Sequence, residues 1–209
     1  MRTCRSLIIA VAALLISAAR RAGAQVDPDS VHHRDNCRLA AQVLATGNPA
    51  PKTAWADDYI LSCGADVGLA LARYLGRLRT GQDTTTLLPV LAQSSFVRDG
   101  TLFSGALAVA RDPGASTPAR VVALLTALTQ VAPRAAFNTG RLFAPGTRVE
   151  CPLQWNSSAL PVAGGSTLPA DAVTQVRSAA SAVGSAGAPV ALRRAGACAR
   201  ILADAGVTG

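Results

Sequence analysis

The sequence is poor in the side chains that most often carry catalysis. Its 209 residues include two histidines, one lysine and one glutamate. The histidines, His32 and His33, stand in a polar stretch before the first predicted helix, which is a poor position for a Ser-His-Asp triad or a zinc ligand. No nucleophile elbow, Ser-x-x-Lys, His-Glu-x-x-His, dinucleotide fingerprint or Walker A motif occurs. We therefore expect no enzyme, and neither a bound metal nor a cofactor.

Aromatic residues are equally scarce, at 4% of the chain, and the 20 basic residues are not interleaved with them. Single-stranded nucleic acids are bound by aromatic stacking platforms set in a basic groove. Four of the arginines belong to the predicted leader, so its removal lowers the net charge from +8 to +4. We expect no nucleic-acid partner. The dominance of arginine, aspartate and alanine is typical of a GC-rich bacterial genome.

The first 24 residues have the pattern of a secretory signal peptide. A basic start is followed by the apolar run Leu7–Ala19, which at 13 residues is shorter than the roughly 20 that a membrane-spanning helix needs. Small residues then occupy both recognition positions of a cleavage site between Ala24 and Gln25. The sequence therefore predicts a protein that is periplasmic or secreted.

Arg20 and Arg21 leave an alternative open, because positive charge is unusual between the apolar run and the cleavage site. In this alternative the leader is retained as an uncleaved N-terminal anchor. No later stretch of 18 residues is free of charge and apolar, so we expect no transmembrane segment once the leader is cleaved. Residues 25–34 are polar and are predicted to form a flexible N-terminal segment.

Four cysteines remain after the leader: Cys37, Cys63, Cys151 and Cys198. An even number in an oxidising compartment predicts two disulfides, for which three connectivities exist. We expect Cys37–Cys63 and Cys151–Cys198, because sequence neighbours in a helical hairpin can reach the Cα separation that a disulfide requires. No Cys-x-x-Cys pair occurs, which favours structural disulfides over a metal site.

Hydrophobic periodicity predicts one all-α domain over residues 35–206, in which antiparallel helical hairpins pack together. Apolar stripes at steps of three and four residues predict helices over about 35–46, 54–78, 84–94, 101–110, 118–131, 170–183 and 190–205. Thr84 is interpreted as the N-cap of its helix, and Pro118 falls in a first turn, where proline is favoured.

Residues 133–168 interrupt this pattern and predict a long loop or β-hairpin insertion, with a β-prone run at Thr147–Cys151. Insertions in helical arrays commonly lie on one binding face, so we expect a recognition element here. It combines arginines with aromatic residues, the types enriched at interface hot spots. The candidate partner-binding residues are Arg134, Arg141, Phe143, Arg148 and Trp155. The alternative is a structural hairpin that covers one end of the core.

Two predicted helices share a pattern: Pro118–Leu125 and Pro189–Ala197 both start with proline and place an arginine and small residues on their inner turns. This pattern resembles the second helix of a HEAT-type repeat. The two prolines are 71 residues apart, about two repeats of 35 residues. The resemblance covers about residues 83–131 and 170–206 and implies a short array of stacked hairpins. An irregular helical bundle is the alternative, because residues 133–168 depart from the repeat pattern.

These observations predict an exported, disulfide-stapled helical protein that acts by non-catalytic protein binding or scaffolding in the cell envelope. The alternative is a small-molecule or lipid carrier with a cavity between helices, and a third class is an enzyme with an unfamiliar aspartate or arginine site. A deep apolar pocket would indicate a carrier, and converging aspartate or arginine side chains an enzyme. A shallow groove with exposed apolar residues would indicate protein binding.

Overall fold

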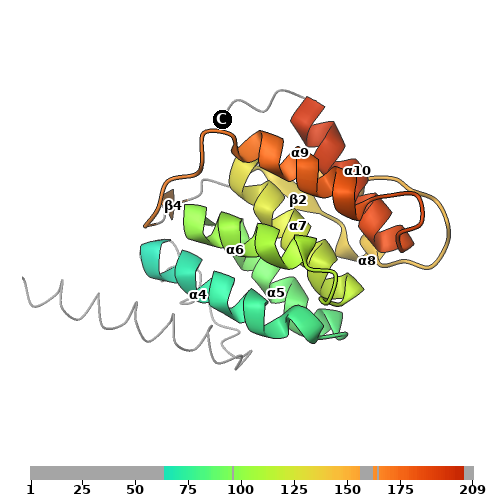
Figure 1. Cartoon of the computed structure of the whole chain (residues 1–209), viewed down its shortest axis with the longest axis horizontal. Coiled ribbons are helices and arrows are strands. Elements are labelled where there is room, and N and C mark those ends of the chain that lie inside the picture. Colours follow the sequence, from blue (N-terminus) through green and yellow to red (C-terminus); the bar gives the residue numbers. More distant parts are fainter. Residues whose placement is uncertain (1–63, 96, 156–161, 164, 205–209) are drawn as a thin grey trace, which may run out of the picture. The chain divides into compact units, whose positions relative to one another are not determined.

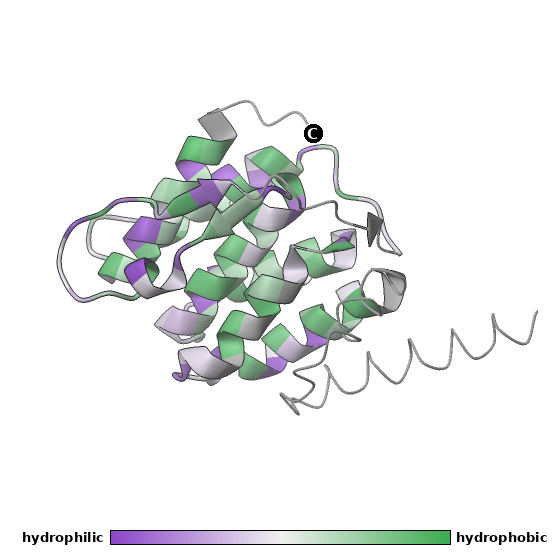
Figure 2. Ribbon diagram, turned by 180° about the vertical axis from the view of Figure 1, so that it is seen from behind, coloured by the Kyte–Doolittle hydropathy of each residue, from purple (hydrophilic) through white to green (hydrophobic). Residues whose placement is uncertain are grey.

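The computed structural model is organised around one central helix, α7 (Thr117–Val131) (Figure 1). The structure describes residues 64–95, 97–155, 162–163 and 165–204. Helix α7 contacts α5, α6, α9 and α10, and every residue from Val121 to Val131 is buried. A helix that is buried all round forms the middle of a core, whereas a surface helix buries one stripe. Figure 2 shows hydrophobic residues concentrated on the central helices, whereas hydrophilic residues lie mostly toward the periphery of the molecule.

The described residues are mostly helical, which confirms the predicted class. Around α7 lie α4 (Gly64–Arg77), α5 (Thr84–Ser94), α6 (Gly100–Arg111), α8 (Thr139–Leu142), α9 (Ala172–Val183) and α10 (Val190–Asp204), with the 3-10 turn η1 (Leu78–Thr80) after α4. All described residues belong to a single compact unit. The predicted helix over 35–46 and the start of the one over 54–78 lie outside the described residues. Within the described part, no helix combines the length and the apolar character needed to span a bilayer.

The N-caps explain where two of these helices begin. Ser116 caps α7 through a hydrogen bond from the Ala119 N–H, and Pro118 stands in the first turn as the sequence predicted. The interpretation of Thr84 as a cap was wrong, because the carboxylate of Asp83 accepts the Thr85 N–H at 2.8 Å. Hydrogen bonds from the hydroxyl and the N–H of Thr85 lower the pKa of Asp83 below its usual value.

The start of α6 is held by the buried carboxylate of Asp99. It accepts the N–H groups of Thr101 and Leu102, at 2.8 and 3.0 Å, and the N–H of Ser166 at 3.1 Å. The Asp99 N–H in turn donates to the side chain of Gln130 on α7. These bonds connect the first turn of α6 to the central helix and to a segment 67 residues further along the chain.

Replacing Asp99 with alanine should lower the free energy of unfolding by about 2 to 3 kcal/mol, because a helix cap and the bond to Ser166 are both lost. Asp171 offers a matched control, since it precedes α9 without making a side-chain cap bond. Asp171→Ala should change stability by less than about 0.5 kcal/mol in urea unfolding. Equal losses in the two variants would contradict the assigned role of Asp99.

The described strands are short and form two separate two-stranded sheets. Strand β1 (Val97–Arg98) pairs in parallel with β4 (Val162–Ala163), and β2 (Ala135–Phe137) pairs antiparallel with β3 (Leu153–Trp155). The insertion therefore contains a β-pair, but the β-prone run Thr147–Cys151 is not a strand. Its backbone is engaged elsewhere, because the Arg148 carbonyl accepts a side-chain hydrogen bond from α10 and Cys151 is bonded to the same helix.

Candidate functional site

Residues 133–155, called the insertion segment from here on, form the part of the predicted insertion that the structure describes without a gap. Along the chain they comprise β2, the short helix α8, a loop that arches outward, and β3 (Figure 1). Strand β2 contacts the central helix α7, and α8 contacts α10. The segment is thus supported on two core helices that are well separated in the sequence.

A disulfide between Cys151 and Cys198 joins the insertion segment to α10. The two Cα atoms are 4.7 Å apart, and Cys198 is completely buried. The predicted pairing of these two cysteines is confirmed. The other predicted disulfide, Cys37–Cys63, lies outside the described residues.

The side chain of Arg194, one turn before Cys198 on α10, makes a second attachment. It is only 6% exposed, and its Nε donates to the Arg148 carbonyl at 2.9 Å. Its Nη1 donates to the carbonyls of Arg141, Leu142 and Ala144, at 3.1, 3.1 and 2.6 Å. A single guanidinium therefore holds the end of α8 and two points of the loop that follows it.

Arg194 lies within Pro189–Ala197, the stretch that resembles a HEAT-type repeat, but this role was not predicted from the sequence. A signal was present, because Arg194 stands three residues after the buried Ala191 and four before Cys198, on the apolar stripe of α10. A charged residue at such a position must find partners inside the protein. The sequence could not identify these partners, since they are main-chain carbonyls of α8 and the following loop, some 50 residues away.

The five predicted partner-binding residues occupy different environments. Arg134 is exposed, and Phe143 is half-buried against the core. Arg141 and Arg148 are exposed and line one pocket, where Arg148 forms an ion pair with Glu150. Trp155, on β3, has an exposed fraction of 57%, the largest among the exposed large apolar side chains of the described residues. The structure thus brings two of the five together and leaves the tryptophan on the surface.

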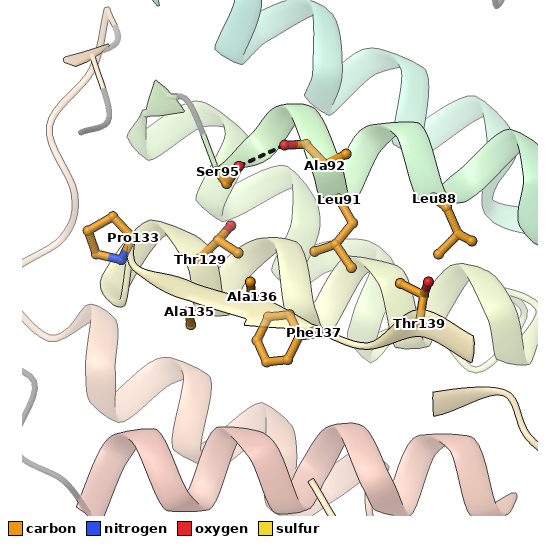
Figure 3. A pocket seen from close by; sticks show the side chains of 10 residues that line it. All are labelled: Leu88, Leu91, Ala92, Ser95, Thr129, Pro133, Ala135, Ala136, Phe137 and Thr139. Carbon is orange, nitrogen blue, oxygen red and sulfur yellow. Dashed lines mark hydrogen bonds between the residues drawn. The ribbon is translucent and has the colours of Figure 1, made fainter. Parts of the chain in front are cut away.

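An apolar groove lies between α5 and β2, with Thr129 of α7 at its base (Figure 3). Its volume is about 240 Å³. It is lined by Leu88, Leu91, Ala92, Ser95, Thr129, Pro133, Ala135, Ala136, Phe137 and Thr139. All three residues of β2 line it, although successive side chains of a strand point to opposite faces. The groove therefore runs along the edge of β2.

The edge of β2 that faces away from β3 carries main-chain hydrogen-bonding groups. The Asn138 N–H donates to the Pro152 carbonyl at 3.0 Å, which makes Ala136 and Gln154 the hydrogen-bonded pair of the ladder. The N–H and C=O of Phe137 are consequently directed away from β3. No backbone partner for either group occurs among the described residues.

A third hollow, of about 700 Å³, lies over α4 and α6 and is wide open to solvent. Its lining includes Arg73, Thr101 and Ser166. The described part of the chain holds no cluster of three histidine, cysteine, aspartate or glutamate side chains that could bind a metal ion.

The chain matches no protein-family model, no curated protein and no solved structure.

Proposed function

We propose that this chain is an exported, disulfide-stapled helical protein that binds another protein of the cell envelope through its insertion segment, without catalysis. One observation carries the proposal. The segment is attached to the core by a disulfide and by four hydrogen bonds from Arg194, yet it keeps Trp155 57% exposed.

Attachment of this kind favours binding because it lowers the entropy lost when a partner docks. A loop held at its base does not have to be ordered by the partner. Tryptophan and arginine are the residue types that most often contribute strongly to protein interfaces. The segment presents both, with Trp155 on β3, Arg148 on the loop before it and Arg141 on α8.

The apolar groove suits a protein segment better than a lipid. Its volume of about 240 Å³ is smaller than the roughly 300 to 1,000 Å³ of pockets that bury a drug-sized ligand. Its wall is a strand edge with main-chain groups available at Phe137, which an extended peptide can pair with. The carrier alternative rests on this groove and on the 700 Å³ hollow, which is too open to bury a ligand.

Export and the finer architecture are part of the same proposal. The Cys151–Cys198 disulfide is compatible with an oxidising compartment, and the predicted leader lies outside the described residues. For the fold, the contacts of α7 with four other helices support an irregular bundle. In a HEAT-like array, each hairpin would contact only its neighbours in the stack.

Replacing Trp155 with alanine should weaken capture of the envelope partner by about tenfold or more, the effect of losing an interface hot spot. The bait is the mature, oxidised protein, and the partner is enriched from the envelope extract of its own cells. Ile201→Ala is the matched control, because Ile201 is also large, apolar and half exposed but lies on α10.

Both variants should keep the melting temperature of the parent, since exposed side chains contribute little to stability. Undiminished capture by Trp155→Ala, together with a melting temperature lowered by several degrees, would show that the segment only covers the core. In that case the proposed function is wrong.

A further inference from the structure

A pocket of about 220 Å³ opens beside the disulfide, between the insertion segment and α10. Three arginines line it: Arg141, Arg148 and Arg194. Its one acidic side chain, Glu150, is exposed and paired with Arg148. The lining therefore carries an excess of positive charge that its own carboxylate does not compensate.

Arg194 is the only one of the three that is buried. Its hydrogen bonds use Nε and Nη1 and end on neutral carbonyls. Within the described residues, Nη2 has no hydrogen-bond partner, and no carboxylate forms an ion pair with this guanidinium. A charge that is 94% buried, next to a cavity, is thus solvated by dipoles alone.

This arrangement prepares the guanidinium for an anion. The carbonyls fix its plane, so no side-chain entropy remains to be lost on binding. Burial lowers the effective dielectric constant, which strengthens the attraction between Arg194 and an incoming negative charge. The two N–H groups of Nη2 remain free to donate charge-assisted hydrogen bonds to an oxygen of a carboxylate or phosphate.

We propose that this pocket is an oxyanion site, in which Arg194 binds a carboxylate or phosphate group at the base and Arg141 and Arg148 neutralise it at the rim. The site deepens the proposed function and rests on it, because an acidic group displayed by the partner would enter here while Trp155 contacts its surface. Glu150 competes for Arg148, so the oxyanion displaces that ion pair when it binds.

The test is a titration of the intact, oxidised protein, followed through the Nε–H signals of its arginines in NMR spectra. The probes are inorganic phosphate, acetate, a glutamate-containing peptide with an amidated C-terminus, and an acid-free peptide with a free C-terminus. Ionic strength is held constant with chloride. At least one probe should shift the Arg194 signal to saturation, and the probe that does so identifies the source of the oxyanion.

Three variants assign the response to the pocket. Arg141→Ala/Arg148→Ala should weaken binding by about tenfold, since charge-assisted hydrogen bonds are lost. Arg73→Ala/Arg98→Ala removes the same charge from exposed positions on α4 and β1 and should leave the affinity nearly unchanged. Glu150→Gln should strengthen binding, because a competing carboxylate is removed.

The inference is overturned if no probe saturates, or if both double variants weaken binding equally, which would indicate a general charge effect. The outcome is separable from that of the proposed function. Capture that depends on Trp155 without any response to the probes overturns the oxyanion site alone. A saturating response with capture that does not depend on Trp155 overturns the proposed function alone.

Discussion

Replacing Arg194 with alanine is expected to lower the free energy of unfolding by about 3 to 5 kcal/mol, because four carbonyls lose a charged donor at once. The carbonyls belong to α8 and the loop after it, which pack against α10, and water can hydrate them only if this part of the segment opens. The loss should therefore appear both in urea unfolding and as faster amide hydrogen exchange between Arg141 and Arg148.

Two further variants separate this contribution from that of charge in general. Arg200→Ala removes an exposed arginine from the same helix and should cost less than about 0.5 kcal/mol. Arg194→Lys keeps the charge but offers donors from a single nitrogen, so its stability should be intermediate. Equal stability of Arg194→Ala and Arg200→Ala would refute the role of the Arg194 hydrogen bonds in holding the insertion segment.

Removing the second attachment should have an effect of similar size. In the chain-entropy model, a disulfide that closes a loop of 47 residues stabilises the folded state by roughly 4 kcal/mol. We expect Cys151→Ala/Cys198→Ala to lose about this much in urea unfolding under oxidising conditions. The helices around α7 should persist, because they do not depend on the bond.

Combining the cysteine changes with Arg194→Ala tests whether the two attachments stabilise the same segment. Both changes free the same segment from α10, so the losses should not add when they are combined. Once the disulfide is absent, the loop opens more easily, and the hydrogen bonds of Arg194 contribute less to the free energy of unfolding. Strict additivity would show that the two attachments act on independent parts of the structure. An unchanged free energy of unfolding in the double cysteine variant would contradict the stabilising role of the bond.

Part of the candidate site could be predicted from residue types alone. The even number of cysteines and their order in the chain indicated the pairing of Cys151 with Cys198. The loss of helical periodicity located the insertion. The five candidate residues are arginines and aromatic residues, types that are common at interfaces. Their environments could not be predicted, since Phe143 and Trp155 are similar in type but only the tryptophan is more than half exposed.

The sequence by itself determined the helical class and the positions of α5, α6, α7, α9 and α10, because these depend on apolar spacing and end signals within a few residues. Only the tertiary structure decided that α7 is enclosed by other helices, that Asp99 connects to Ser166, and that Arg194 meets four carbonyls. The physical reason is the distance along the chain over which each interaction acts. Caps and stripes act between neighbours in the chain, whereas a buried charge selects whichever dipoles the packing of distant segments places within hydrogen-bonding distance.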